Sequence, residues 1–370
     1  MDAIITLRQI SKQPHSARQP IVDNLSFDLW PGEILVLLGP SGSGKTTTLR
    51  LIAGLDSPDH GEIHIHGVPA FKNGRQSPPE ARRVGMVFQD YALFPHMTVN
   101  ENIRFGLHAY PKHHQQARIN EVLQLVGLDD FSQRFPHQLS GGQQQRVAIA
   151  RALAPAPPVV LLDEPFSNLD SAIRDHVRGE LRTILRNANT SAIIVTHDQH
   201  EALAIADRIA LLHEGVLHQI GTPEALFTQP HTRFAAAFMG QADFLTVDAN
   251  GPYLHSELGT LRFVTMPYTI DSTPASILLR YDDVNFVPTT VGNAVICART
   301  YEGTHYHYRI RLQSGAQISW KWRHDSAFAI GSRGNVTYAT MHPLVYFSGE
   351  YAVGSVIPVT ISQSSHHSTE

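Results

Sequence analysis

The stretch Gly39–Thr46, GPSGSGKT, constrains the fold more than any other part of this sequence. It fits G-x-x-x-x-G-K-[ST] at every fixed position, a pattern typical of a loop whose backbone amides surround a polyphosphate. An apolar run of strand length, Glu33–Leu38, precedes it, and the following residues carry apolar side chains at helical spacing. This order predicts an α/β nucleotide-binding domain in which Lys45 reaches the terminal phosphates and the Thr46 hydroxyl binds Mg²⁺.

A second apolar run, Val159–Pro165 (VVLLDEP), ends in two acids. Strands of an open parallel sheet read as continuous apolar runs, and active groups gather at their carboxyl ends. We therefore expect Asp163 to hold the Mg²⁺ shell and Glu164 to orient and deprotonate the attacking water. A solvated acidic turn is the alternative for a lone Asp-Glu pair, and the phosphate-binding loop makes that interpretation the weaker one.

Two further apolar runs end in polar side chains. The run Ala192–His197 (AIIVTH) ends in a histidine that would point toward the γ-phosphate, and Val84–Gln89 (VGMVFQ) ends in a glutamine. A lone histidine at a strand end is more often a structural hydrogen-bonding group, but the neighbouring strand ends favour a catalytic role for His197. Gln89 is expected to bind a metal-ligated water or the Mg²⁺ ion itself.

The stretch Leu139–Leu153, LSGGQQQRVAIARAL, resembles half of a phosphate site. Ser140, Gly141 and Gly142 precede a helical pattern, so their backbone N–H groups are free to bind an anion at a helix N-terminus. No lysine lies beside them. The other half of such a site must therefore come from elsewhere.

Composition narrows the class of protein. The 370 residues exceed one ordinary core and predict two domains. The net charge of −4 is divided evenly about residue 240, so neither half of the chain is basic enough to indicate nucleic-acid binding.

Cys297 is the only cysteine, which excludes an intramolecular disulfide and favours the cytosol. The longest apolar runs are far shorter than a membrane helix, so any work at a membrane requires a partner that spans it.

Six motifs in this order, GPSGSGKT, VFQD, LSGGQ, VVLLDEP, SNLD and IVTHD, resemble the nucleotide-binding subunit of an ATP-binding cassette (ABC) transporter from Ile4 to about Gly240. By that resemblance Asp163 and Glu164 form the Walker B motif, Asp170 lies in the D-loop and His197 is the switch histidine. The nucleotide-binding set that the resemblance implies is Gly39, Pro40, Ser41, Gly42, Ser43, Gly44, Lys45, Thr46, Thr47, Gln89, Ser140, Gly141, Gly142, Gln143, Asp163 and His15.

The resemblance implies an ATPase that uses ATP and Mg²⁺ and drives solute import through a separate permease. Thr46, Gln89 and Asp163 would hold Mg²⁺, and Glu164, His197, Gln89 and Lys45 would carry catalysis. In this family the serine and glycines of the signature motif, here Ser140–Gln143, bind ATP held by the opposite subunit, so a second copy supplies the missing half-site. His15 is kept as a nucleotide contact because no aromatic residue precedes Phe27 in the segment that usually stacks on adenine.

The family also predicts further partners and a place in the cell. The resemblance implies a helical subdomain at about 90–155, and within it Tyr91–His96 is expected to receive the permease, although ordinary core is an alternative for its apolar rings. A substrate-binding protein would act indirectly on the same transporter. The expected location is the cytoplasmic face of the inner membrane, as a peripheral subunit.

Beyond residue 240 the pattern changes to short β-type runs broken by Gly, Asn, Asp and Pro, so we expect a nucleotide-binding domain at 1–240 and a β-rich domain at 241–370. The second domain resembles the oligonucleotide-fold-like (TOBE-type) domain of certain importers, which implies a role in dimerisation or regulation. His64 with His66, and His305 with His307, could ligate metal as pairs on a strand, but solvated faces are the favoured interpretation.

Cargo is not encoded in the motifs, because the ATPase does not touch it. The run 152–178 and the QADFL junction most resemble the ferric iron branch, while polyamine, sulfate or thiosulfate, phosphonate and sugar branches share most motifs. A soluble ABC protein of translation or DNA repair is the alternative of another class, although such chains usually carry two cassettes or a coiled-coil insertion. A P-loop kinase would lack LSGGQ.

Overall fold

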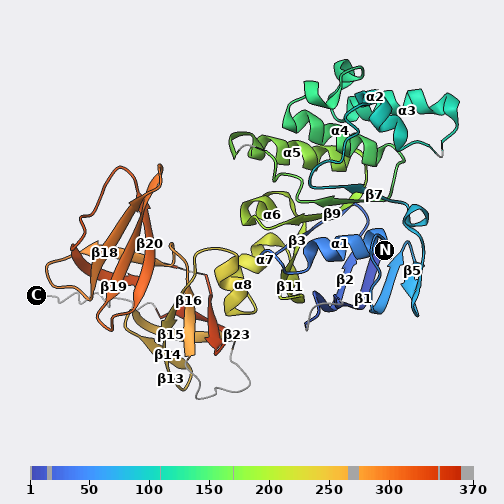
Figure 1. Cartoon of the computed structure of the whole chain (residues 1–370). Coiled ribbons are helices and arrows are strands. Elements are labelled where there is room, and N and C mark those ends of the chain that lie inside the picture. The colour runs from blue at the N-terminus through green and yellow to red at the C-terminus, as the bar shows by residue number, and fades with distance from the viewer. Residues whose placement is uncertain are drawn as a thin grey trace, which may run out of the picture. The chain divides into compact units, whose positions relative to one another are not determined.

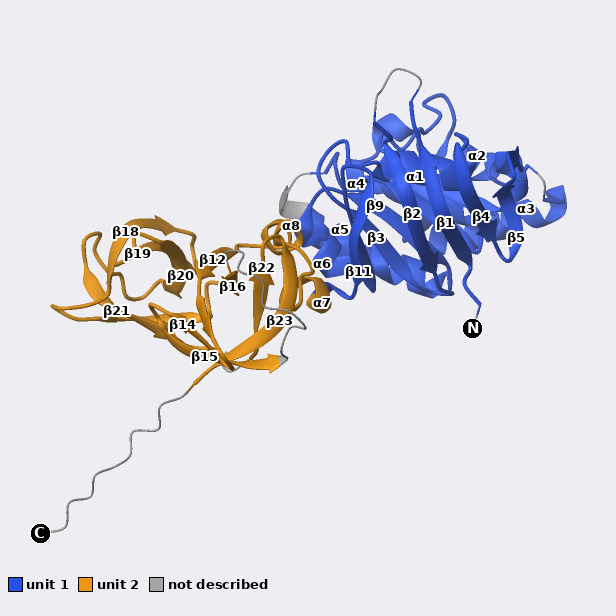
Figure 2. Cartoon of the chain, turned by 90° about the horizontal axis from the view of Figure 1, so that it is seen from below, with its two compact units in different colours: residues 1–223 blue, residues 224–370 orange. Residues whose placement is uncertain are grey.

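The computed structural model describes residues 2–14, 19–108, 110–169, 171–265, 275–340 and 342–359. The chain divides into two compact units, residues 1–223 and residues 224–370 (Figure 2). The first unit contains the predicted nucleotide-binding motifs. The division falls earlier than the boundary at 240 expected from the sequence, because the two short helices after residue 222 pack with the β-rich unit.

A six-stranded sheet forms the centre of unit 1. All its strands are parallel except β11, which pairs antiparallel with β10 at one edge. The strands, in order across the sheet, are β11 (Val216–Gly221), β10 (Arg208–His213), β3 (Ile34–Leu38), β9 (Ser191–Thr196), β8 (Val159–Asp163) and β7 (Val84–Val87). Every residue of β3, β8 and β9 is buried, as the continuous apolar runs predicted.

A second, antiparallel sheet lies in the same unit. Its strands, in order across the sheet, are β2 (Val22–Leu29), β1 (Ile5–Lys12), β4 (His60–Ile65), β5 (Val68–Lys72) and β6 (Arg75–Gln76). Leu49, Leu51 and Ile52 of α1 (Lys45–Ala53) share one apolar cluster with β1, β2 and the central strands. This helix therefore joins the cores of the two sheets and is fixed behind the phosphate-binding loop.

Helices between residues 90 and 155 gather at one end of unit 1 (Figure 1). They are α2 (Val99–Phe105), α3 (Lys112–Leu125) and α4 (Gly141–Leu153), with 3₁₀ turns at Asp129–Phe131 and Pro136–Gln138. The fully buried Asn102 amide donates to the carbonyls of Phe94, Met97 and Thr98 and accepts from the Phe94 amide. One side chain thus fixes the loop that enters α2.

The rest of unit 1 consists of two helices and connecting turns. These helices are α5 (Ser171–Asn187) and α6 (Gln199–Ile205), and they pack against each other. A third 3₁₀ turn, Pro79–Arg82, precedes β7. In the part of the chain that the structure describes, no helix is long and apolar enough to cross a membrane.

Unit 2 consists mainly of two antiparallel sheets, preceded by α7 (Pro223–Thr228) and α8 (Arg233–Phe238). One sheet has the order β12 (Asp243–Thr246), β16 (Ala275–Leu279), β22 (Leu344–Ser348), β23 (Tyr351–Pro358), β15 (Gly259–Thr265), β14 (Tyr253–Ser256) and β13 (Asp248–Asn250). The other has the order β17 (Val284–Pro288), β21 (Arg333–Tyr338), β18 (Ala294–Tyr301), β19 (His305–Leu312) and β20 (Gln317–Arg323). One apolar cluster draws on both sheets, so they share a core, in line with the predicted all-β domain.

Arg280 ties the short helices to this unit. Its Nη1 donates to the carbonyls of Ala236 (2.9 Å) and Gln241 (2.6 Å), and its Nη2 donates to that of Phe227 (3.0 Å). The guanidinium also lies 4.3 Å from the Phe227 ring centroid. Burial lowers the pKa of Arg280 to about 10, so the side chain stays charged at neutral pH. These bonds explain why α7 and α8 belong to unit 2.

Replacing Arg280 with Met should destabilise unit 2 by about 3 kcal/mol, because one buried and two partly buried carbonyls lose a charged donor. Hydrogen exchange of the α8 and β16 amides would measure this loss directly. The exposed Arg262 of β15 provides the control, since Arg262→Met should change exchange very little. Equal protection in the two variants would contradict the role assigned to Arg280.

Candidate nucleotide site

The phosphate-binding loop follows β3 and ends at the first residue of α1. Gly44 caps that helix with φ +92° and no side-chain cap, so no side chain satisfies the first amides of the helix through a cap. A Cβ at Gly44 would lie 2.4 Å from the Ile21 carbonyl oxygen, and one at Gly39 would lie 2.0 Å from that of Leu212. Only glycine fits at these two positions, which accounts for the fixed glycines of the motif.

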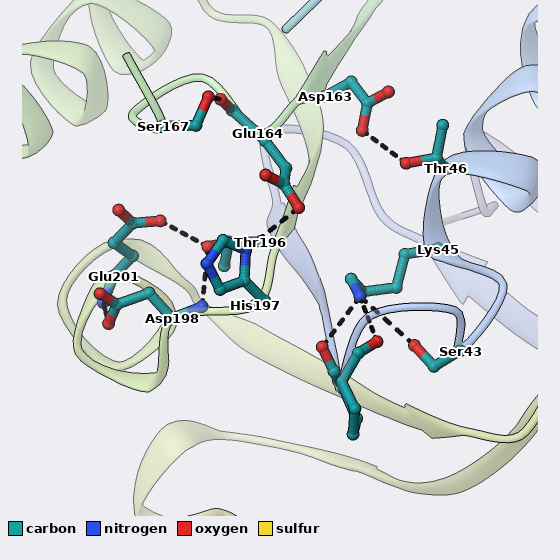
Figure 3. Close-up of polar contacts among 12 residues, drawn as sticks. Ser43, Lys45, Thr46, Asp163, Glu164, Ser167, Thr196, His197, Asp198 and Glu201 are labelled. Carbon is teal, nitrogen blue, oxygen red and sulfur yellow. Dashed lines mark hydrogen bonds and ion pairs between the residues drawn. The ribbon is translucent and has the colours of Figure 1, made fainter. Parts of the chain in front are cut away.

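Lys45 points back into this loop (Figure 3). Its Nζ donates to the carbonyls of Gly39 and Pro40, both at 2.8 Å, and to Ser43 Oγ at 3.4 Å. Burial lowers the pKa of Lys45, while Glu164 and Asp163 raise it. The ammonium group is therefore held at the loop by carbonyl oxygens and attracted by the acids at the end of β8, as a phosphate-binding lysine requires.

Thr46 and Asp163 meet at the neighbouring strand end. Thr46 Oγ1 donates to Asp163 Oδ1 at 2.9 Å, and the Asp163 side chain is nearly fully buried. Burial raises the pKa of Asp163, only partly offset by the Thr46 hydrogen bond. A hydroxyl and a carboxylate are hard oxygen ligands, and a buried carboxylate short of positive charge is what a bound divalent cation stabilises. These residues fit the predicted Mg²⁺ site.

Glu164 and His197 face each other across the ends of β8 and β9. The Glu164 Oε1 and His197 Nδ1 atoms lie 3.1 Å apart, and both side chains are partly exposed. Glu164 adopts φ +42°, a conformation that costs a non-glycine residue energy. Its amide bonds the Val195 carbonyl and its own carbonyl accepts from Ser167 Oγ, so the surrounding backbone holds this turn in place.

The backbone of Gln89 is hydrogen-bonded to the SNLD motif. Its carbonyl accepts a 2.8 Å hydrogen bond from Asn168 Nδ2, and the residue itself is exposed. Asn168 belongs to the SNLD motif, so the glutamine loop and the D-loop are tied together. Asp170 and His15, both named from the sequence, lie outside the described residues.

The signature residues sit at the N-terminus of α4. Ser140 caps the helix, with Ser140 Oγ accepting from the Gln143 amide and Gln143 Oε1 accepting from the Ser140 amide. Ser140 and Gly141 are exposed, and a Cβ at Gly141 would lie 3.5 Å from Leu169 beside the D-loop. Within the described residues, no hydrogen bond or ion pair joins this cap to the phosphate-binding loop, so the chain alone does not complete that contact.

The structure places Tyr91 in the core, which was the alternative for the apolar rings of its segment, and corrects the expectation for His66. Tyr91, predicted as part of a permease-docking segment, is buried at 4% exposure, with its hydroxyl 3.4 Å from the Pro165 carbonyl. It therefore packs beneath the segment, whereas Pro95 and His96 are exposed. His66 lies beyond the end of β4 in a turn at φ +53°, so it does not share a strand face with His64. Among the described residues, no group of three His, Cys, Asp or Glu side chains is arranged to hold a metal.

Sequence reasoning missed Arg151 near the C-terminal end of α4. Its guanidinium donates to the carbonyls of Ala92 (2.7 Å) and Tyr91 (2.8 Å) and lies 5.6 Å from the Phe94 ring centroid. The acceptors are backbone atoms, so neither the spacing nor the type of residue at the other end signals the contact. Only the basic residue in the last helical turn hinted at a partner there.

Comparison with known proteins identifies the family. The family model described as ABC transporter matches residues 22–167. The spermidine/putrescine import ATP-binding protein PotA of Pseudomonas fluorescens is 39% identical, over 91% of this chain and 94% of that protein. The chain belongs to the ATP-binding proteins of ABC transporters. The Fe(3+) ions import ATP-binding protein FbpC 1 of Rhizobium meliloti is 41% identical over 84% of this chain and 88% of that protein.

Solved structures agree with this assignment. The dimeric post-hydrolysis structure of the ATP-binding cassette MJ0796 bound to ADP and Pi matches with a TM-score of 0.52 and 32% identity, covering 59% of this chain and 98% of that one. This ABC protein is accordingly an ATPase that uses ATP with Mg²⁺ and couples hydrolysis to import. The relatives differ in the cargo that they are named for, so the comparisons establish an importer ATPase of unspecified substrate.

The buried Asp163 carboxylate should lower the stability of the nucleotide-free ABC protein. Because burial raises its pKa above the unfolded value, its charge is unfavourable at neutral pH, and this cost disappears as pH falls below the unfolded pKa. Asp163→Asn should therefore raise Tm without nucleotide, by on the order of 2 °C. The same variant should lose the Tm increase that Mg²⁺ and ATP give the wild type.

Thermal unfolding at neutral pH, with and without Mg²⁺ and ATP, measures both effects. Asp59→Asn is the matched control, because a hydrogen bond from the Gln13 amide lowers the pKa of Asp59 and reverses the expected sign. The control should keep the nucleotide-induced shift. An unchanged Mg²⁺ and ATP shift in Asp163→Asn would exclude Asp163 from the metal site.

Proposed function

We propose that this ABC protein powers a solute importer by hydrolysing ATP at a site built on Lys45, Thr46, Asp163, Glu164 and His197. The observation that carries the proposal is the 3.1 Å contact between Glu164 and His197, beside the Thr46–Asp163 pair. A partly exposed carboxylate in contact with an imidazole is suited to orient and deprotonate a water molecule, while the histidine orients the carboxylate and the γ-phosphate. Lys45 stabilises charge on the terminal phosphates.

The Mg²⁺ ion would be held by Thr46 and Asp163, with Gln89 as a further ligand, and would neutralise charge on the phosphate oxygens. The remaining P-loop residues, together with Thr47, bind phosphates through amides and hydroxyls. Gln89 supports this assignment indirectly, since its backbone is fixed by Asn168 while its side chain remains exposed and able to move toward the nucleotide. His15 remains a proposed contact for adenine.

We propose that two copies share each site. The signature set Ser140–Gln143 supports this, because its cap is exposed and has no hydrogen bond to the P-loop among the described residues of its own chain. Bound ATP then links the P-loop of one copy to the signature of the other, and hydrolysis removes that link.

The permease is proposed to dock near Tyr91–His96, with Pro95 and His96 as the exposed contacts and Tyr91 as buried support. The chain would act as a peripheral subunit at the cytoplasmic face of the inner membrane, with a substrate-binding protein delivering cargo to the permease. Asn102 and Arg151 favour this docking segment, since their bonds give it one conformation before a partner binds.

Ferric iron is the proposed cargo. The proposal is based on two features of this chain, the run that ends at Arg178 in unit 1 and the QADFL junction. The FbpC relative of Rhizobium meliloti supports this. Polyamine is the second candidate, because the PotA relative matches 91% of this chain against 84% for the iron relative. A sulfate/thiosulfate relative, CysA of Burkholderia mallei, is 46% identical over 68% of this chain and 72% of that protein, so sulfate belongs in the same test.

Unit 2 is proposed to be an oligonucleotide-fold-like TOBE-type domain that contributes to dimerisation or regulation. Its two antiparallel sheets with a shared core favour this type. Regulation would then act through a unit distinct from the one that binds nucleotide.

Glu164→Gln should bind ATP with near wild-type affinity but lower the turnover rate by at least ~100-fold, since the carboxylate acts only on the chemical step. Phosphate release from purified protein and nucleotide binding by fluorescence measure the two effects. In cells, uptake of ferric iron, spermidine and sulfate should be compared between wild type and variant. Uptake should fall in the variant only for the true cargo. Normal ATPase activity in the variant would contradict a catalytic role for Glu164.

Complementation tests the shared site. Lys45→Ala and Ser140→Arg should each be nearly inactive alone, because one lacks the P-loop charge and the other blocks the signature cap. Mixed in equal amounts, they should recover about a quarter of wild-type activity, since half of the dimers then contain one intact composite site. A mixture no more active than its components would contradict the shared arrangement.

A further inference from the structure

A small polar cavity lies behind the Glu164–His197 pair. Its volume is about 90 Å³, and it is lined by Glu164, Ser167, Arg174, Thr196, His197, Asp198 and Glu201. All seven side chains are polar or charged, and the space is large enough to admit water. Glu201 is the one acid of this set that is buried and has no part in the mechanism proposed above, so its contacts call for an explanation.

A hydrogen bond from a threonine connects Glu201 to the end of β9. It lies on α6 at 5% exposure, and its Oε2 accepts a hydrogen bond from Thr196 Oγ1 (Figure 3). Thr196 Oγ1 in turn accepts from the Asp198 amide at 3.0 Å. The threonine hydroxyl therefore accepts from the Asp198 amide and donates its single proton to Glu201. Both bonds join Thr196, directly before His197 in the chain, to residues that follow it.

The N-cap of α6 also holds the backbone next to His197. Asp198 Oδ1 accepts from the amides of His200 (2.7 Å) and Glu201 (3.2 Å), so α6 begins at a fixed point directly after His197. The backbone at His197 is therefore held by the β9 strand before it and by the α6 cap after it. This arrangement aims the imidazole at Glu164.

The surroundings of Glu201 combine burial with nearby positive charge. Arg174 lines the same cavity and donates from Nε to the Leu169 carbonyl at 3.0 Å. Burial raises the pKa of Glu201 above its usual value, with a further contribution from Asp198, and the Thr196 hydrogen bond and the positive charges of Arg174 and Arg178 offset this rise only in part. Glu201 is thus an acid kept inside the protein at an energetic cost, which a role in holding the histidine turn would explain.

We propose that Glu201 is a positioning residue for His197. By fixing the Thr196 hydroxyl, and through it the Asp198 amide, Glu201 keeps the imidazole within hydrogen-bond distance of the Glu164 carboxylate. The Thr196 hydroxyl is the connecting group. This inference rests on the proposed roles of Glu164 and His197 and adds the residue that sets their geometry.

Steady-state ATPase kinetics of the purified full chain test the proposal. Glu201→Ala and Thr196→Val should each lower kcat by about tenfold, because a small displacement of a catalytic group is costly. KM for ATP should stay within about twofold, since the contacts of Lys45 and the P-loop do not involve Glu201. Glu201→Gln and Thr196→Ser should restore most of kcat, because each keeps the hydrogen-bonding atom that its position supplies.

Glu33 supplies a matched control. It is a second buried glutamate of unit 1, at 7% exposure, and it bonds the Trp30 amide and Arg208 at the start of β3, away from the cavity. Glu33→Ala should lower stability while keeping kcat. If it lowers kcat as much as Glu201→Ala does, the loss reflects general destabilisation and the proposal fails.

A double-mutant cycle separates this proposal from the one on which it rests. If Glu201 acts through His197, Glu201→Ala should cause no further loss in a His197→Ala background. A further loss there would overturn the positioning role. Wild-type kcat in His197→Ala would instead refute the proposed role of His197, whereas an inactive His197→Ala beside fully active Glu201→Ala and Thr196→Val would refute only the inference about Glu201.

Discussion

The chemistry of this ABC protein depends on the parallel pairing of β3, β9 and β8. Leu38 pairs with Thr196, and Asp163 pairs with Val195, so the three strands end at nearly the same level. Because every residue of these strands is buried, a slip of one residue in register would exchange the side chains that pack on the two faces of the sheet and disrupt the packing on both. Packing of the sheet therefore fixes where the phosphate-binding loop, the acids and the histidine emerge, and the site follows from the register.

Much of this arrangement is predictable from sequence, because its determinants are local. The glycines of the P-loop indicate positions where no Cβ fits, and the apolar runs indicate strands buried on both faces. The proximity of Asp163 to Thr46, and of Glu164 to His197, then follows from the general rule that parallel strands present their carboxyl ends at one edge. The two-part division and the all-β second unit are likewise visible as changes of pattern.

The contacts that the sequence does not reveal are those from side chains to backbone carbonyls. Asn168 bonds the Gln89 carbonyl, Arg151 bonds those of Tyr91 and Ala92, and Arg280 bonds three carbonyls across α7, α8 and the following turn. Every residue has a backbone carbonyl, whatever its side chain. The spacing and the types of residues in a sequence therefore do not indicate such a bond. Tyr91 illustrates the result, since the sequence left both docking and ordinary core open for its ring, and the structure shows that the ring is buried.

Helix α4 unites two of these elements in one rigid body. Its N-terminus carries the Ser140 cap, and Arg151 near its other end holds the segment that begins at Tyr91. Thirteen helical residues span about 20 Å, and a hydrogen-bonded helix of this length transmits a tilt with little internal deformation. In the proposed dimer, a force applied at the cap by nucleotide on the other copy would thus move the proposed docking segment together with α4, with no flexible segment between them.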